Sequence, residues 1–443
     1  MTMLAAAAAR TQVGLHPEVE TMPRERLAAL QLQRLRETLE RAWRLPWHRD
    51  RLRAAGLDAP GDLHSLDELS GLPFMVKTDL RDQYPFGLFA QPVSELARLH
   101  ASSGTTGKPT VVGYNTADLG TWAELMARTL HCAGARRGDI VHNAYGYGLF
   151  TGGLGMHAGA ERLGAVVVPA SGGGTERQVA LIMDFGARVL CATPSYALAI
   201  AEVAEHEGVD LRKSNLRVGL FGAEPWSEPM RREIEARLPV KAIDNYGLSE
   251  IMGPGVAVEC EQQDGLHGWE DHFLFEVVDP DTQAPLPEGE AGELVITTLT
   301  KQALPMLRYR TRDITRITRA ACDCGRTHAR LLRVSGRNDD MLIVRGVNVF
   351  PSQIESALVG HAQLAPHYQL VLDRRGSLDH VTLEAEAAAG VAAGQWEAVG
   401  RDAAHRIKSL IGITVDVVVR EPGALPRSQG KAVRVRDLRP KNG

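Results

Sequence analysis

The sequence has few cysteines, no long apolar run and no large excess of charge. Only five of its 443 residues are cysteines, and this odd, low number argues against a disulfide framework and favours a reducing compartment. No apolar run approaches the roughly 18 to 20 residues that a membrane-spanning helix needs. The net charge of −4 gives no reason to expect nucleic acid or an anionic membrane as a partner. Residues 1–10 are rich in alanine and lack the basic start and long apolar core of a signal peptide, so we expect a cytoplasmic protein.

The length and the spacing of apolar residues indicate more than one domain. A chain of this length more naturally forms two or three domains than one. Between about residues 99 and 295, short apolar runs alternate with helical stretches, which indicates βα units and largely parallel sheets. After Gly336 a strand–helix–strand–strand–helix–strand order follows, typical of a small separate domain. We therefore predict an α/β fold with a large N-terminal domain of several subdomains, residues 1–336, and a small mobile α+β domain, residues 337–443.

A helix is predicted to begin at Pro23. Ala28, Leu32, Leu35 and Leu39 recur at helical spacing, with Arg or Glu at other positions, so they form one apolar stripe. We expect this stripe to pack against the body of the protein rather than on a membrane.

A run of glycines and hydroxyl residues between residues 102 and 108 has the composition of a phosphate-binding loop. Small residues let backbone N–H groups converge on phosphate oxygens, and Lys108 adds a positive charge. A Walker loop needs four residues between its glycines and a Ser or Thr after its Lys. Here two residues separate Gly104 from Gly107, and Pro109 follows the lysine. We interpret the run as a phosphate loop of another class, with a solvated polar turn as the alternative.

Five ordered motifs resemble those of the acyl-adenylate-forming superfamily, which includes acyl-CoA synthetases, peptide-synthetase adenylation domains and luciferases. They are residues 103–109, 246–250, 309–313, 336–340 and 430–431. A closer resemblance, to phenylacetate–CoA ligases, rests on residues 144–153, 221–226, 269–273 and 345–351. The similarity extends from roughly Leu27 to Arg439. It implies an ATP-dependent aryl-acid–CoA ligase, which forms an acyl-adenylate and pyrophosphate and then transfers the acyl group to the thiol of coenzyme A.

The resemblance also implies a nucleotide site. Glu250 would hold Mg²⁺, which prefers carboxylate and phosphate oxygens, Tyr246 would lie against the adenine ring, and Asp313 would bind the ribose hydroxyls. The alternative for Asp313 is an ion pair with Arg310 or Arg312. The complete set of implied nucleotide-binding residues is Ser102, Ser103, Gly104, Thr105, Thr106, Gly107, Lys108, Gly222, Ala223, Glu224, Asp244, Asn245, Tyr246, Gly247, Ser249, Asp313, Arg337 and Lys431.

Catalysis is assigned by the resemblance to Lys431, Glu250, Thr105 and Thr106. Lys431 follows a glycine in a short loop near the end of the small domain. It would stabilise the negative charge that develops as the carboxylate attacks the α-phosphate of ATP. The small domain would then turn about Asp339, withdraw the lysine and open a channel for coenzyme A.

Two segments are candidates for the walls of the acid pocket. Aromatic rings and glycines suit a slot for phenylacetate, benzoate or a substituted ring, although the aromatic residues could instead be core. The implied substrate-binding residues are Tyr145, Gly146, Phe150, Gly153, Ala223 and Pro225. Two alternatives remain open: transfer of the acyl group to a carrier-protein phosphopantetheine, and a nucleotide- and aryl-acid-binding protein without turnover. A homodimer is plausible by resemblance alone.

Four residues are candidate ligands of a structural Zn²⁺ ion. Cys260, His267, Cys322 and Cys324 make a Cys₃His set, which is common in such sites. The C-x-C spacing is shorter than the common C-x₂₋₄-C, so reduced thiols without metal are the alternative, and nearby His272 leaves the histidine open. The two other cysteines, at 132 and 191, lie in apolar contexts and are predicted to be core residues.

Overall fold

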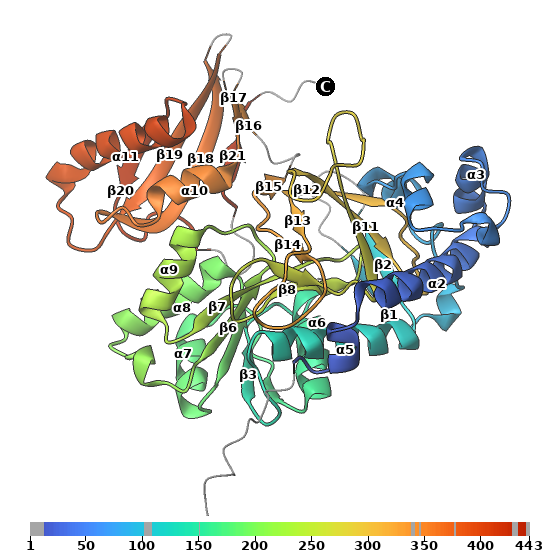
Figure 1. Ribbon diagram of the computed structural model, residues 1–443. Coiled ribbons are helices and arrows are strands. Elements are labelled where there is room, and N and C mark those ends of the chain that lie inside the picture. The colour runs from blue at the N-terminus through green and yellow to red at the C-terminus, as the bar shows by residue number, and fades with distance from the viewer. Residues whose placement is uncertain are drawn as a thin grey trace, which may run out of the picture.

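The computed structural model describes residues 13–101, 109–149, 151–337, 342–344, 347–375, 378–427 and 433–439. A long mixed sheet with helices on both faces forms the centre of the molecule, and a separate C-terminal sheet lies beside it (Figure 1). This arrangement confirms the predicted α/β class. No helix among the described residues combines the length and the apolar character needed to cross a membrane.

The central sheet has nine strands in the order β13-β14-β9-β8-β7-β6-β5-β3-β4. The sheet is parallel in one half, from β4 through β3, β5 and β6 to β7. It is antiparallel in the other half, where β7 pairs with β8 and the order continues through β9 and β14 to β13. The prediction of largely parallel sheets was therefore wrong for this half, because a tight turn rather than a crossover helix follows β7. The bounds are β3 Ile140–Asn143, β4 Val166–Val168, β5 Val189–Ala192, β6 Val218–Gly222, β7 Lys241–Leu248, β8 Gly253–Glu259, β9 Leu266–Gly268, β13 Ile317–Thr318 and β14 Arg330–Leu331.

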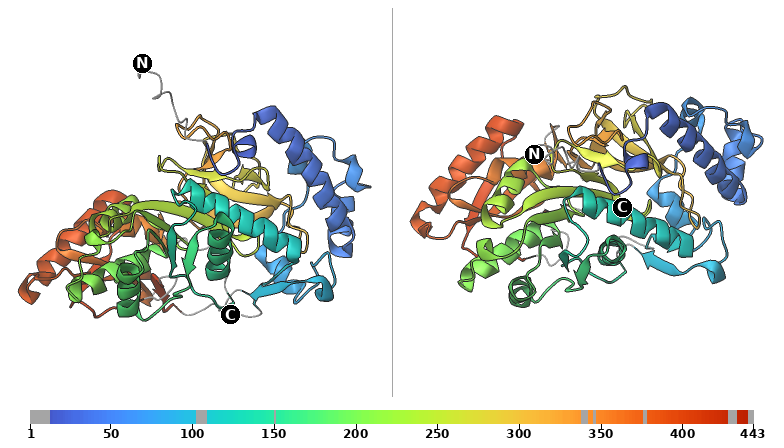
Figure 2. Two further views of the ribbon diagram at one scale, coloured as in Figure 1. Left: turned by 90° about the horizontal axis from the view of Figure 1, so that it is seen from below. Right: turned by 60° about the horizontal axis from the view of Figure 1, so that its bottom comes forward.

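Both faces of the parallel half are covered, as the alternation of its side chains shows. Val189 and Cys191 of β5 join one hydrophobic cluster, whereas Leu190 and Ala192 join another. The first cluster includes residues of α5 and α6, and the second those of α7, α8 and α9 (Figure 2). The helices are α5 Thr116–Cys132, α6 Gly152–Leu163, α7 Thr175–Asp184, α8 Pro194–His206 and α9 Glu228–Arg237. Both cysteines predicted to be core residues, Cys132 and Cys191, are buried.

A second sheet and the N-terminal helices complete the large body. The sheet is antiparallel, and its strands are β10 Phe273–Val278, β11 Gly292–Thr298, β12 Tyr309–Thr315 and β15 Gly336–Arg337. A separate hairpin joins β1 Arg98–Ala101 to β2 Val111–Tyr114. The remaining helices of the large body are α1 Pro17–Glu20, α2 Arg24–Trp43, α3 Pro46–Ala54 and α4 Lys77–Asp82, with 3₁₀ turns at 60–62, 67–71, 93–95 and 211–213. A further 3₁₀ turn, at 393–395, lies in the C-terminal part.

The buried face of α2 differs in part from the predicted stripe. Leu35 and Leu39 are buried as expected, but Ala28 and Leu32 are only half-buried. Polar residues share the buried face: Gln31 donates to the carbonyl of Glu270 and Thr38 to that of Leu299. Leu32 still packs against the main core, so the stripe lies on the predicted side. The buried polar residues were not predicted because apolar spacing does not reveal them.

The C-terminal part has a hydrophobic core of its own. Its four-stranded sheet has the order β20-β19-β18-β21, with α10 and α11 contributing to the core. The elements are β16 Leu342–Val344, β17 Val347–Val349, α10 Pro351–Leu358, β18 Leu364–Arg375, β19 Leu378–Ala387, α11 Trp396–Ile411, β20 Asp416–Arg420 and β21 Val435–Asp437. The predicted boundary at 336/337 falls inside β15, which pairs with β12. The division of the chain at that point stays a prediction.

Candidate active site

The described site residues gather where two parallel strands end. Gly222 closes β6, and Tyr246 and Gly247 lie near the end of β7, which pairs with β6. Ligands of α/β sheets bind outside the carboxyl ends of such strands. A Cβ on Gly222 would lie 2.1 Å from the carbonyl oxygen of Asn245, so the two strands approach closely only because Gly222 has no side chain. Ala223 follows with φ of 70°, a strained conformation of the kind that clusters at functional sites.

Tyr246, Asp313 and Arg337 come together from three different strands. The Tyr246 hydroxyl donates to Asp313 Oδ2 at 2.5 Å, and Arg337 Nη1 lies 3.6 Å from Asp313 Oδ1. Burial and the Asp313 charge raise the pKa of Tyr246 well above its ordinary value, so the hydroxyl stays protonated. The alternative pairing of Asp313 does not occur, because the nearby arginines face Glu293 instead, at 2.6 Å from Arg310 and 3.6 Å from Arg312.

Glu250 lies in the turn after β7 and is buried. Its Oε1 is 3.4 Å from Lys77 Nζ, and its carbonyl oxygen accepts a hydrogen bond from Lys301 Nζ at 3.1 Å. Lys301 is fully buried over the ring of Tyr114, and burial lowers its pKa to about 8. Sequence reasoning missed both lysines, since neither belongs to a motif and both come from distant segments. Ser249 contacts Thr151 through their hydroxyls at 3.1 Å.

Asp244 and Asn245 make contacts that hold β7 in place. Glu259 Oε2 accepts from the backbone N–H of Asp244 at 2.8 Å, and Arg231 binds both oxygens of Glu259 at 2.8 Å. Burial and the Glu259 charge raise the pKa of Asp244 to about 6. The Asn245 side-chain oxygen accepts from the N–H of Gly255 at 3.2 Å. Nucleotide binding by these two residues stays a prediction.

The candidate acid pocket brings two of the predicted segments close to each other. Tyr145 is buried, and its neighbours include the backbone of Gly222 and the carboxyl of Glu224. Glu224 accepts from the N–H of Ser195 at 2.8 Å. Ala223 and Pro225 are exposed beside it.

Gly153 and Gly146, two further residues predicted to bind the acid, are in contact with each other. The N–H of Gly153 donates to the carbonyl of Gly146 at 3.1 Å, and a Cβ on Gly153 would lie 2.4 Å from that oxygen. The start of α6 therefore lies close to the backbone of Gly146 because Gly153 has no side chain. Any other residue at position 153 would force the two segments apart.

Several predicted site residues lie outside the described residues. They are Ser102, Ser103, Gly104, Thr105, Thr106, Gly107, Lys108, Phe150, Asp339 and Lys431. The strands on either side of the phosphate loop are described, and Ala101 of β1 pairs with Val111 of β2. The N–H of Ala101 donates to the carbonyl of Leu149 at 3.3 Å, so this hairpin lies next to the acid-pocket segment.

The four candidate zinc ligands come together at the antiparallel end of the central sheet. Their ligand atoms all lie within 4.8 Å of one another. Cys260 Sγ is 3.8 Å from Cys322 Sγ, and Cys324 Sγ is 3.3 Å from His267 Nε2. Tetrahedral zinc with bonds of about 2.3 Å places sulfur ligands roughly 3.8 Å apart, so the set fits such an ion. His272 lies outside the cluster and contacts Thr300 at 2.8 Å and Asp271 at 3.1 Å.

The sequence and the fold define the class of this protein. The sequence model of AMP-binding enzymes matches residues 68–300, and that of the AMP-binding enzyme C-terminal domain matches residues 346–439. The chain belongs to the family of AMP-binding enzymes.

Within the family, the chain is similar to coenzyme A ligases. It is 52% identical to a phenylacetate–coenzyme A ligase of Thermus thermophilus over 96% of this chain and 99% of that protein. A crystal structure of 2-hydroxyisobutyryl-CoA ligase in the postadenylation state, in complex with R3-HIB-AMP, matches with a TM-score of 0.91 and 31% identity, over 97% of this chain and 93% of that one. For the same enzyme with 2-HIB-AMP and CoA in the thioesterification state, the TM-score is 0.73 with 32% identity, over 98% of this chain and 94% of that one.

Proposed function

We propose that this chain joins phenylacetate, or a closely related aryl acid, to coenzyme A at the expense of ATP. It is an AMP-forming acid–thiol ligase. The observation that carries the proposal is the meeting of Tyr246, Asp313 and Arg337 beside the carboxyl ends of β6 and β7. A flat ring, a carboxylate and a guanidinium at such an edge suit the base, the ribose and a phosphate of ATP.

The predicted site residues, of which Asp313 and Glu250 lie in the described part of the chain and Lys431 does not, would serve the first half-reaction in distinct ways. Asp313 would accept hydrogen bonds from the ribose hydroxyls, and Glu250 with its buried carboxylate would hold Mg²⁺, which neutralises phosphate charge when bound. The pairing of Glu250 with Lys77 keeps its charge compensated when no cation is bound. Lys431 would stabilise the charge that develops between the attacking carboxylate and the α-phosphate.

The second half-reaction needs no nucleophile from the protein. The thiol of coenzyme A attacks the acyl carbonyl of the adenylate, AMP leaves, and the thiol proton passes to solvent. Turning of the small domain about Asp339 would remove Lys431 and admit the thiol. Transfer to a carrier-protein phosphopantetheine, a homodimeric state and a cytoplasmic location remain predictions.

We infer that Cys260, His267, Cys322 and Cys324 bind a structural Zn²⁺ ion. Their ligand atoms are close enough for one tetrahedral ion. Bound zinc would fasten the segment of Cys322 and Cys324 to the end of β8 and to β9, and it would take no part in the acyl chemistry.

The proposed function is tested by product analysis with ATP, Mg²⁺ and coenzyme A across a panel of aryl and short aliphatic acids. We expect AMP and pyrophosphate with phenylacetate or a related aryl acid. Lys431→Ala should abolish adenylate formation while largely sparing thioester formation from supplied acyl-adenylate. Lys408→Ala, which alters an exposed lysine of α11, serves as the control. ADP as the product, or no turnover with any acid, would contradict the proposal.

A further inference from the structure

A single carboxylate of the large body holds two residues of the C-terminal part. Glu202 lies on α8, and its Oε2 is 3.2 Å from His367 Nε2 on β18. Arg427, which follows β20, binds the same carboxylate with Nε at 3.2 Å from Oε2 and Nη2 at 3.3 Å from Oε1. Burial alone would raise the pKa of Glu202, but His367 and Arg427 outweigh it and lower the pKa to about 2. Glu202 is therefore ionised at neutral pH.

Arg427 is in turn fixed to its own domain by Glu386 of β19. Its Nη1 and Nη2 lie 2.7 and 2.9 Å from the two Glu386 oxygens. The buried Glu386 also accepts from the backbone N–H groups of Gly423 at 3.0 Å and Leu425 at 2.7 Å. One guanidinium thus joins α8 to the segment 423–427, which precedes the predicted catalytic Lys431 by only four residues.

A second polar contact lies nearby on the same face. Glu355 of α10 is buried, accepts from the N–H of Ser227 at 3.1 Å, and accepts from the hydroxyl of Tyr368 at 3.1 Å. Ser227 is the N-cap residue of α9, so this contact also joins the two parts of the chain. Figures 1 and 2 show the C-terminal part beside the region of α8 and α9 and away from α2 and α3.

The overall arrangement matches one state of a solved ligase better than another. The TM-score is 0.91 with the postadenylation structure of 2-hydroxyisobutyryl-CoA ligase and 0.73 with its thioesterification structure. The two structures of that enzyme therefore differ in arrangement, and this chain has the arrangement of the first. The contacts of Glu202 belong to that arrangement.

We propose that Glu202 is a positioning residue for adenylate formation. Together with His367, Arg427 and Glu386 it forms the Glu202 latch, which holds segment 423–427 against the large body for adenylate formation and releases it before thioester formation. This inference rests on the proposed function, because it assigns Lys431 to the first half-reaction.

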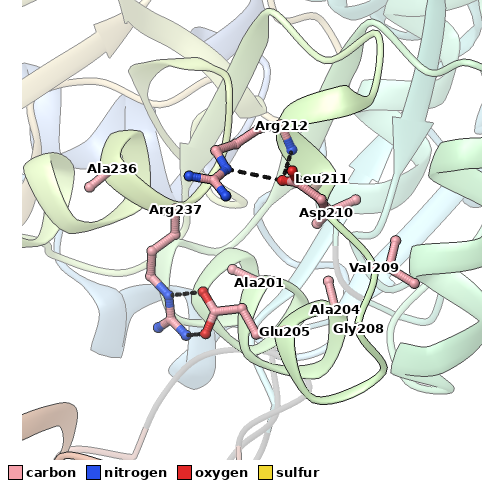
Figure 3. A pocket seen from close by; sticks show the side chains of 10 residues that line it. All are labelled: Ala201, Ala204, Glu205, Gly208, Val209, Asp210, Leu211, Arg212, Ala236 and Arg237. Atoms are coloured by element: carbon pink, nitrogen blue, oxygen red, sulfur yellow. Dashed lines mark hydrogen bonds and ion pairs between the residues drawn. The ribbon is translucent and has the colours of Figure 1, made fainter.

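A matched control lies one turn further along α8. Glu205 pairs with Arg237 at 2.6 Å, so its carboxylate is engaged within the large body, in a groove of about 360 Å³ between α8 and α9 (Figure 3). Glu202→Gln and Glu205→Gln make the same chemical change on the same helix. Only the first removes a charge that the C-terminal part binds.

The half-reactions are measured separately, by ATP–pyrophosphate exchange with phenylacetate and by transfer from supplied phenylacetyl-adenylate to coenzyme A. We expect Glu202→Gln to slow the exchange ~3- to 10-fold, as loss of a multiply bonded ion pair implies, and to leave the transfer unchanged. Glu205→Gln should alter neither. An equal loss of both half-reactions, or no loss of exchange, would overturn the proposal.

Trypsin provides a readout that does not depend on activity. It cleaves after arginine, and Arg427 is held by Glu202 and Glu386. Cleavage at this bond, followed by mass spectrometry, should be faster in Glu202→Gln than in the unmodified chain or Glu205→Gln. Equal rates in all three proteins would show that Glu202 does not hold Arg427. This result stands even if the unmodified chain exchanges pyrophosphate with no acid, an outcome that would defeat the proposed function instead.

Discussion

At the scale of single residues, the carboxylate of Asp244 near the site is buried beside a second carboxylate, which disfavours its negative charge. Asp244 lies next to Glu259, and both carboxylate oxygens of Glu259 accept hydrogen bonds from Arg231. The pKa of Asp244 is therefore raised from 3.8 to about 6 by burial and by this neighbour. The folded protein binds the proton more tightly than the unfolded chain, so ionised Asp244 opposes folding above pH ~6, and this cost vanishes as the pH falls towards 3.8.

Asp244→Asn should therefore stabilise the protein at neutral pH and barely at low pH. The expected gain in the free energy of unfolding is about 2–3 kcal/mol at pH 7.5 and below about 1 kcal/mol at pH 4. Urea unfolding at the two pH values measures it. Asp210→Asn, which changes a half-buried carboxyl paired with the exposed Arg212, should give no such gain. A gain that is equal at both pH values would contradict the assigned cause.

At the scale of whole elements, the central sheet combines a parallel half with an antiparallel extension. Strands β8, β9, β14 and β13 continue the central sheet antiparallel beyond β7. Two of these strands, β13 and β14, have only two residues each, so hydrogen bonds alone hold them weakly. The Cys₃His cluster lies at this end, with Cys260 directly after β8 and His267 within β9.

Loss of the proposed zinc should loosen this end of the sheet. Cys324→Ser is expected to lower zinc content from about one ion per chain and to lower the melting temperature by several degrees. Turnover at 25 °C should change little. Elemental analysis and thermal unfolding measure the two effects, and Cys191→Ser, which alters a core cysteine outside the cluster, is the control. Purified protein without zinc would remove the claim.

Elements and motifs differ in how far they could be predicted from sequence. The first helix expected after Gly336 is α10, and Pro351 at its start is a local signal for where it begins. The βα units that build the parallel half were predicted, but the antiparallel direction of the strands beyond β7 was not, since a strand's direction depends on how the chain returns. Tyr246, Asp313 and Arg337 were named from motifs. Their mutual contacts, and those of Lys301 and Lys77 with Glu250, depend on tertiary folding that local patterns do not encode.

At the scale of the whole molecule, buried charges join segments that are far apart in sequence. Glu20 at the end of α1 is fully buried, and its Oε2 lies 2.7 Å from Arg326 Nε, 306 residues further on. Its Oε1 lies 3.6 Å from Arg128 Nε, and Arg128 binds Asp271 at 2.9 Å. This network fastens the N-terminal segment across the central sheet.

Glu20→Gln should destabilise the protein strongly. It leaves the guanidinium of Arg326 buried without its counter-charge, and breaking a buried pair costs about 3–5 kcal/mol. Thermal unfolding should show a fall in melting temperature of several degrees. Glu18→Gln, which alters an exposed carboxyl on the same helix, should shift the melting temperature by less than about 1 °C. Similar shifts for both variants would contradict the role of the network.

Several contacts between the two parts of the molecule are polar, among them those of Glu202 and Glu355. Among the described residues, Val359 is the one buried hydrophobic side chain of the C-terminal part that joins the core of α7, α8 and α9. The remaining contacts given above are ion pairs and hydrogen bonds, for which water can substitute when the parts separate. Selection of variants for heat resistance alone would favour apolar substitutions of the polar residues between the two parts. Such variants would have a higher melting temperature but a lower turnover rate. Screens of this enzyme should therefore measure turnover together with thermal stability.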